Sequence, residues 1–338
     1  MDLSTEYLGL SLRSPLVASA GPLTGTADGI RRLASAGVGA VVLPSLFEEQ
    51  LRDEAEQDFR LGEAYADSNF EALSYLPRGA EDGSGRYLGL ISRAVETAGI
   101  PVIASLNGVS PGGWTDYAYA IEQAGASAIE LNIYYLPSDP LIPARDAERR
   151  YTEVLTTVKA VVSIPVAVKL SPYFSSFGEM AVLLDHAGAD GLVLFNRFLQ
   201  TDIDPETFTV STGFRLSVPA EAALPRAWIS WLRGRVRCSL GATTGVETAA
   251  DVAAYLLAGA DVVMSTSALL RHGPDHAQVL LDGLRAWMHR KGFTSVAQVR
   301  GLLAKSAAGR PAYARLGYLS AIEQATHAYS SSAFAAGG

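Results

Sequence analysis

The chain has 338 residues, of which 49% are hydrophobic, and it carries 27 Lys and Arg against 35 Asp and Glu. The hydrophobic fraction excludes a disordered chain, and the length allows either two domains or one large barrel. The net charge of −8 argues against nucleic-acid binding as the main role, and the single cysteine excludes a disulfide framework and a zinc ribbon. The first residues lack the features of a signal peptide, and no apolar run is long enough to cross a bilayer. We therefore expect a cytoplasmic enzyme with no membrane or nucleic-acid partner.

Eight short apolar runs divide the chain. They are almost continuous in Val, Ile, Leu and Ala, a pattern typical of parallel strands that are covered on both faces. The predicted strands span residues 16–19, 40–43, 102–106, 128–133, 166–170, 191–196, 237–240 and 261–265.

Amphipathic segments of helical length lie between these runs, and several end in an Ala-Gly pair followed by an apolar residue. Glycine accepts the left-handed conformation that commonly ends a helix, so the pair marks a repeated strand–helix unit. Eight such units predict an α/β fold of the (β/α)8 TIM barrel type. A doubly wound sheet is the alternative, but the turn at 20–25 (AGPLTG) lacks the glycine pattern of dinucleotide-binding folds. The predicted helices span residues 27–36, 87–98, 115–124, 146–162, 176–187, 225–233, 248–258 and 275–290.

The chain is longer than such a barrel needs, and the excess lies mainly in two places. Residues 46–86 and 197–224 each follow the carboxyl end of a predicted strand, and barrel active sites form on that face. We interpret them as rim insertions in a barrel of residues 1–305, followed by a C-terminal extension at 306–338 whose end frays. The acidic run in the first insertion is interpreted as a solvated helix face.

Lys169 is the most distinctive residue at a strand end, because it interrupts an otherwise apolar run. A buried cation is costly unless its site compensates or removes the charge. Three interpretations are open. Lys169 pairs with a structural carboxylate such as Glu130, forms a Schiff base as a nucleophile, or places a cation beside a bound cofactor.

Glycine and hydroxyl residues follow the last two predicted strands. In barrels of this type, the turns after these strands commonly form a phosphate site, where backbone N–H groups hold the anion. Thr244, Gly245 and Ser267 are therefore candidates to bind a phosphate group. The alternative is an ordinary turn that ends in a helix cap at Thr248.

Asparagines end three of the predicted strands. A carboxamide offers both donors and acceptors, so Asn107, Asn132 and Asn196 are suited to an imide or to the edge of a flavin. His272 and His276 are four residues apart, but Gly-Pro lies between them, and we interpret this segment as a helix-initiating loop rather than a metal site. Cys238 precedes the expected barrel mouth and is interpreted as a small buried hydrophobic residue.

Several of these motifs together resemble dihydroorotate dehydrogenases, especially the soluble class 1 branch, over roughly residues 1–305. The similar segments are LGL at 8–10, SPLVASAG at 14–21, ELN at 130–132, VKLSPYF at 168–174, Asn196 and TGVET at 244–248.

The resemblance implies a barrel that binds FMN and acts as a homodimer. Lys169 would face the N1/C2 edge of the flavin and stabilise the anionic reduced ring. By position, Ala20, Gly21, Ser45, Asn132, Thr244, Gly245 and Ser267 would contact the cofactor. The substrate would be bound by Asn69, Asn107, Asn132 and Asn196.

Three departures from the family pattern concern the substrate. Tyr135, or Tyr134 with an offset of one residue, stands where the family has a Cys or Ser base, and tyrosine is a better acid than base near neutrality. Pro44 replaces a lysine of the second strand, and the paired glycines expected near 216–219 are absent from the sequence. The fold and flavin are expected to survive these changes, whereas dihydroorotate as substrate is left open.

The leading hypothesis is an FMN-dependent oxidoreductase that acts on a C–C bond next to a carbonyl, either as dihydroorotate oxidation in pyrimidine biosynthesis or as reduction of an activated C=C bond. Its substrate would be a small planar carbonyl compound. The resemblance allows fumarate as acceptor, or NAD through a separate electron-transfer partner. A Schiff-base lyase that uses Lys169 and a non-catalytic flavin- or phosphate-binding barrel are the alternatives.

Overall fold

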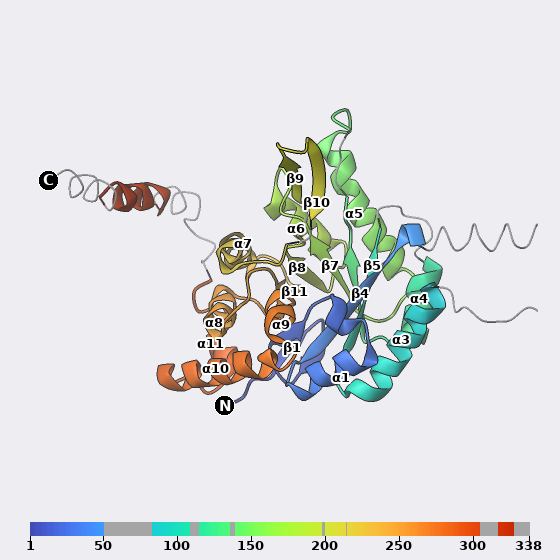
Figure 1. The fold of residues 1–338 in the computed structure, drawn as a ribbon, viewed down its shortest axis with the longest axis horizontal. Coiled ribbons are helices and arrows are strands. Elements are labelled where there is room, and N and C mark those ends of the chain that lie inside the picture. Colours follow the sequence, from blue (N-terminus) through green and yellow to red (C-terminus); the bar gives the residue numbers. More distant parts are fainter. Residues whose placement is uncertain are drawn as a thin grey trace, which may run out of the picture.

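The computed structural model describes residues 1–50, 83–108, 115–135, 139–197, 200–213, 215–304 and 317–327. Its central feature is a closed barrel of eight parallel strands, in which the last strand pairs with the first (Figure 1). This is the predicted TIM barrel. Its strands are β3 (Leu16–Ala18), β4 (Ala40–Phe47), β5 (Val102–Asn107), β6 (Ala128–Asn132), β7 (Val166–Leu170), β8 (Gly191–Leu194), β11 (Ser239–Ala242) and β12 (Val262–Ser265).

Alternating side chains of these strands fill two different spaces. One set, which includes Val42, Ile103 and Val193, packs inside the barrel, and the other packs against the surrounding helices. An N-terminal hairpin, β1 (Thr5–Tyr7) and β2 (Leu10–Leu12), joins the inner set and was not predicted. Its backbone binds at the start of β11, where Leu8 N donates to Ser239 Oγ at 3.0 Å. The hairpin therefore closes the barrel at the amino ends of the strands.

Helices cover the outside of the barrel, and each predicted helix has a counterpart. Gly125 and Gly188, which follow two of them, have φ angles of 94° and 96°, as the Ala-Gly pattern predicted. A short extra helix directly follows β12 and was missed. The helices are α1 (Ala27–Ser35), α3 (Gly83–Ala98), α4 (Thr115–Gln123), α5 (Ala144–Lys159), α6 (Phe177–His186), α7 (Ala223–Leu232), α8 (Ala249–Ala258), α9 (Ser267–His272), α10 (His276–Lys291) and α11 (Val296–Val299).

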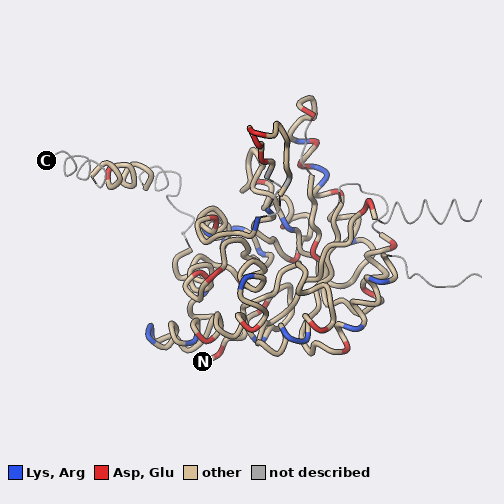
Figure 2. Tube along the Cα trace, in the orientation of Figure 1, with Lys and Arg blue, Asp and Glu red and all other residues tan. Residues whose placement is uncertain are grey.

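The segment after β8 contains an exposed antiparallel hairpin, β9 (Gln200–Asp204) and β10 (Thr209–Gly213), and a single turn, η3 (Pro219–Ala222), that leads into α7. Most of the first predicted insertion lies outside the described residues. Of the C-terminal extension, only a helix at 317–327 is described. Acidic and basic residues alternate over the outer helices and loops (Figure 2). Within the described ranges, no helix has the length and hydropathy to span a membrane.

Candidate active site

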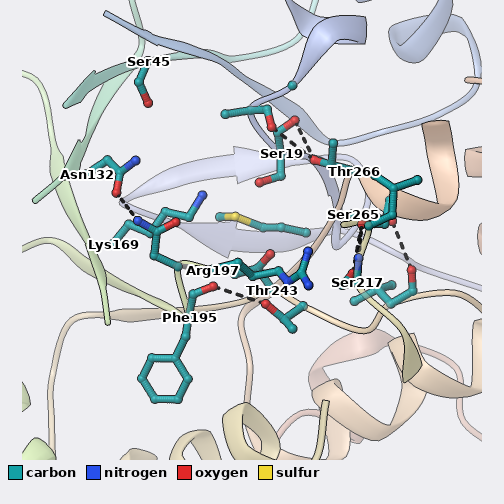
Figure 3. A pocket seen from close by; sticks show the side chains of 18 of the residues that line it. Ser19, Ser45, Asn132, Lys169, Phe195, Arg197, Ser217, Thr243, Ser265 and Thr266 are labelled. Atoms are coloured by element: carbon teal, nitrogen blue, oxygen red, sulfur yellow. Dashed lines mark hydrogen bonds between the residues drawn. The ribbon is translucent and has the colours of Figure 1, made fainter. Parts of the chain in front are cut away.

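A cavity of about 370 Å³ opens at the carboxyl ends of the barrel strands (Figure 3). It is lined by residues from seven of the eight strand ends or the loops that follow them, so distant parts of the sequence meet there. The predicted site residues among them are Ala20, Gly21, Ser45, Asn132, Lys169, Asn196, Thr244, Gly245 and Ser267.

Lys169 lies at the floor of this cavity. Alternation along β7 turns it into the barrel, and its register partner on β6 is Asn132, so the two side chains are neighbours (Figure 3). Its Nζ atom is 3.4 Å from Oε1 of Glu130, and the two side chains are only 11% and 2% exposed. The predicted pairing of Lys169 with Glu130 is therefore present, and the lysine still contributes to the cavity.

Two asparagines are joined at the same level. Asn196, which follows β8, donates from Nδ2 to Oδ1 of Asn132 at 2.6 Å. Each side chain limits the rotation of the other, so the pair presents carboxamide atoms in a fixed orientation. Such a pair can bind a planar ligand that has both carbonyl and N–H groups.

A cradle of donors lies on the opposite side of the cavity. Gly245, with a φ angle of 70°, donates its N–H to Ser217 Oγ at 3.2 Å, and the Ser217 and Ser267 hydroxyl oxygens are 3.0 Å apart. A Cβ atom at Gly245 would lie 2.8 Å from Ala222 N, so only glycine fits. The backbone N–H and two hydroxyls converge from three segments. Backbone N–H and hydroxyl groups are the kind of donors that bind phosphate in proteins.

Tyr255 supports this cradle from α8. Its hydroxyl is placed to donate to the carbonyl oxygens of Thr243 and Thr244, at 3.1 and 2.6 Å. Thr244 has a φ angle of 81°, which is unusual for a residue with a side chain. The bond from the buried tyrosine helps to hold the loop in this conformation.

The ends of β3 and β12 pack closely together where they line the cavity. A Cβ atom at Gly21 would lie 2.6 Å from Thr266 Cγ2, so the absence of a side chain at residue 21 lets the two chain segments meet. Thr266 Oγ1 donates to the Ser19 carbonyl at 3.0 Å and joins the ends of β12 and β3.

Arg197 and Ser217 are lining residues that the sequence did not single out. Arg197 donates from Nε and Nη2 to Glu221 Oε1 at 3.2 and 3.0 Å, and from Nη1 to the Arg215 carbonyl. It lies between the main cavity and a second one of about 340 Å³, which also shares Asn196. Both residues belong to the second predicted insertion or its border, where no repeat pattern signals which side chains turn inward.

Three predicted residues are not among those lining the cavity: Tyr134, Tyr135 and Asn107. The Tyr135 ring lies beside α5, with the Arg150 guanidinium 4.5 Å from its centre. Asn107 is buried at the end of β5. Asn69 lies outside the described residues. The catalytic and substrate-binding roles of these residues stay predictions.

The two histidines contact Glu247, and the cysteine is buried, as its sequence context predicted. His272 Nε2 is 2.7 Å from Glu247 Oε1, and His276 Nε2 is 3.2 Å from the Glu247 carbonyl oxygen. In the described part of the chain, no three His, Cys, Asp or Glu side chains form a group able to hold a metal ion. Cys238 is buried just before β11, far from that strand's carboxyl end, and burial together with Asp185 raises the pKa of its thiol.

Comparison with known proteins agrees with this architecture. A family model described as dihydroorotate dehydrogenase matches residues 2–288. An inferred dihydroorotate dehydrogenase A (fumarate) of Aeropyrum pernix is 29% identical, over 89% of this chain and 97% of that protein. The dihydroorotate dehydrogenase B (NAD(+)) catalytic subunit of Methanothermobacter thermautotrophicus is 27% identical, over 89% and 98%, and that of Methanocella arvoryzae is 29% identical, over 86% and 94%. Because the family model matches most of its length and its strands form a closed barrel, the chain belongs to the dihydroorotate dehydrogenase family.

Proposed function

We propose that this chain is an FMN-dependent oxidoreductase that acts on a C–C bond next to a carbonyl group, with hydride transferred to or from the carbon of that bond that lies farther from the carbonyl. The observation that supports it most is the combination, in one cavity, of the buried cation Lys169 and the cradle formed by Gly245, Ser217 and Ser267. A cation for an electron-rich ring and a donor set for a phosphate are the two groups that a flavin mononucleotide needs.

The remaining lining residues fit the same cofactor. In this proposal Thr244, Gly245 and Ser267 hold the phosphate, and Ala20 and Gly21 form the surface against which the ring lies. Ser45 and Asn132 complete the contacts with the polar edge of the ring. The close approach at Gly21 supports this placement, because a side chain there would occupy the space beside Thr266.

The chain's own residues prepare the reaction in three ways. Lys169 stabilises negative charge that develops at the floor of the cavity, and it does so from a fixed position. Asn132 and Asn196, joined by their hydrogen bond, orient the carbonyl group of the substrate. The proton on the neighbouring carbon is assigned in this proposal to a tyrosine after β6, Tyr135 or Tyr134, although neither lines the cavity as described. When bound, FMN would supply the hydride donor or acceptor.

The substrate is a small planar carbonyl compound, either dihydroorotate or a compound with an activated C=C bond. The tyrosine in place of a Cys or Ser base favours the second, because a phenol is a better proton donor than acceptor near neutral pH. A homodimer and a separate electron-transfer partner are further parts of the proposal. The relative from Methanothermobacter is named as a catalytic subunit.

The ion pair between Lys169 and Glu130 argues against the alternative function, a Schiff-base lyase. Lys169 Nζ is engaged in an ion pair, 3.4 Å from Glu130 Oε1, whereas a Schiff-base lysine must present a free amine to the substrate carbonyl. Borohydride in the presence of a carbonyl substrate is therefore expected to leave Lys169 unmodified, and trapping of the substrate on Lys169 would support the lyase.

Anaerobic half-reactions test the reaction itself. The flavin of the purified protein is mixed with dihydroorotate, and in a second experiment the photoreduced protein is mixed with an α,β-unsaturated ketone or with orotate. We expect bleaching in the first experiment or return of the flavin band in the second, and Tyr135→Phe and Tyr134→Phe identify the tyrosine whose loss slows the step. Bound flavin that responds to none of these compounds would contradict the proposed reaction and favour a non-catalytic barrel.

A further inference from the structure

Glu130 is a carboxylate sealed inside the barrel, below the cavity. It lies on β6 two residues before Asn132, and it is 1% exposed. Alternate residues of a strand face the same side, so Glu130 is directed into the barrel one layer deeper than Asn132. Its register partners are Ser105 on β5 and Ala167 on β7. A charge in such a place is costly unless a second charge compensates it.

The positive charge of Lys169 compensates the negative charge of Glu130 without a hydrogen bond between the two side chains. Its Nζ atom lies 3.4 Å from Glu130 Oε1, but the contact lacks the geometry of a hydrogen bond, and Oε1 accepts none from any described residue. Unsatisfied buried oxygens are rare and call for an explanation. Since water screens this pair poorly, Glu130 acts on Lys169 mainly through its charge.

The other groups around Glu130 offer no competing cation. Tyr7, from the hairpin that closes the barrel floor, is fully buried, and burial together with the charge of Glu130 raises the pKa of its hydroxyl. Asp261, a second carboxylate that acts on Tyr7, is paired with Arg233 and Arg300 at 2.6 and 2.9 Å. In the described ranges, Lys169 is the one cation within 4.0 Å of Glu130.

We propose that Glu130 is a positioning residue that holds the Lys169 ammonium group at the cavity floor and partly neutralises its charge. Its function, which rests on the proposed flavin chemistry, is to limit how strongly the site favours the reduced cofactor. Lys169 alone would draw electron density into the ring, and a fixed negative charge behind it weakens that effect. The pair thus sets the reduction potential of the site.

Chemical labelling of the cofactor-free protein tests the first half of this proposal. The sequence has four lysines, Lys159, Lys169, Lys291 and Lys305, so acetic anhydride modification of each is readily followed by peptide mass spectrometry. Glu130→Gln keeps the shape of the side chain and removes the charge that pairs with Lys169, so the Lys169 side chain is no longer held by an ion pair and its nitrogen is freer to react. We expect faster labelling of Lys169 in this variant and unchanged labelling of Lys159.

Asp190→Asn is the matched control. Asp190 lies 2.7 Å from Lys159 Nζ, outside the barrel, and its removal is expected to change the labelling of Lys159 and not that of Lys169. Glu130→Asp keeps the charge but moves it away, so its Lys169 labelling rate lies between those of the wild type and Glu130→Gln. If Glu130 serves only to fill space, Lys169 labelling stays at the wild-type rate in both Glu130 variants, and the proposal is overturned.

The second half is tested on the protein loaded with FMN. Spectroelectrochemical titration is expected to show a more positive midpoint potential in Glu130→Gln and an unchanged one in Asp190→Asn. An unchanged potential in Glu130→Gln overturns the tuning role. If the protein binds no FMN, the proposed function fails, whereas the labelling experiment still decides whether Glu130 controls Lys169.

Discussion

Gly245 lies in the proposed phosphate cradle, and an added methyl group has little room there. In Gly245→Ala, the new Cβ would meet Ala222 N at 2.8 Å, Ala222 Cβ at 2.9 Å and the Val218 carbonyl oxygen at 2.9 Å. Two of these three atoms belong to the backbone, which cannot rotate away. The φ angle of 70° adds a second cost, because residues with a side chain disfavour the left-handed region.

The two costs can be separated with a control. The left-handed conformation costs about 1–2 kcal/mol, and overpacking costs about 1–3 kcal/mol more. Gly292 has a φ angle of 77° and no atom within 4 Å of an added Cβ, so Gly292→Ala has the first cost alone. We expect Gly245→Ala to lower the free energy of unfolding by about 2–5 kcal/mol, against about 1–2 kcal/mol for Gly292→Ala.

Urea denaturation of the cofactor-free variants, followed by tryptophan fluorescence, measures these losses. FMN titration then shows whether the cradle is damaged, and we expect weaker FMN binding in Gly245→Ala and wild-type affinity in Gly292→Ala. Equal stability losses in the two variants, or full FMN affinity in Gly245→Ala, would refute the geometry described for the cradle.

Three further predictions concern single contacts. Gly21→Ala should weaken FMN binding, because its new Cβ clashes with Thr266 Cγ2. Adding Thr266→Ser should restore FMN affinity, since serine lacks that methyl group. A double variant that binds FMN no better than Gly21→Ala would exclude this clash as the cause. Tyr255→Phe should lower the free energy of unfolding by about 1–3 kcal/mol and reduce FMN affinity, because the Thr243 and Thr244 carbonyl oxygens lose the tyrosine hydroxyl as donor. Unchanged FMN affinity would show that the tyrosine does not support the cradle. Burial opposes the charge of Asp185, but backbone N–H donors outweigh this effect and lower the pKa of its carboxyl group below 3.8. Asp185→Asn should therefore be less stable than the wild type near neutral pH, and urea titrations should show that this difference in stability shrinks as the pH approaches 3. A stability difference that is independent of pH would contradict the lowered pKa.

The barrel was predictable because its signals are local and repeated. Each strand is an apolar run, and glycines such as Gly125 end the helices where the pattern placed them. The N-terminal hairpin was missed because its strands have three residues each, too few to show alternation. The exposed hairpin from Gln200–Asp204 to Thr209–Gly213 buries no apolar face and gives no periodic signal.

Some residues that line the cavity were predictable because they lie at or just after a strand end, as do Lys169, Asn132 and Gly245. Ser217 was missed because it meets Ser267 across 50 residues of sequence, from a loop whose path depends on tertiary packing. Glu130 was recognised only as one possible partner of Lys169, because the sequence cannot show which oxygen lies near which nitrogen. Tyr135 was placed by its distance in sequence from Asn132, and sequence distance does not specify side-chain direction.

Quantitative FMN titration of the cofactor-free protein tests the central claim most directly. Flavin fluorescence and absorbance are followed as FMN is added to the wild type and to Gly245→Ala. We predict saturation at one FMN per chain, with a shifted flavin absorbance band and weaker binding in the variant. A wild-type protein that takes up no FMN, or that binds it equally well after the substitution at Gly245, would contradict the assignment of this cavity.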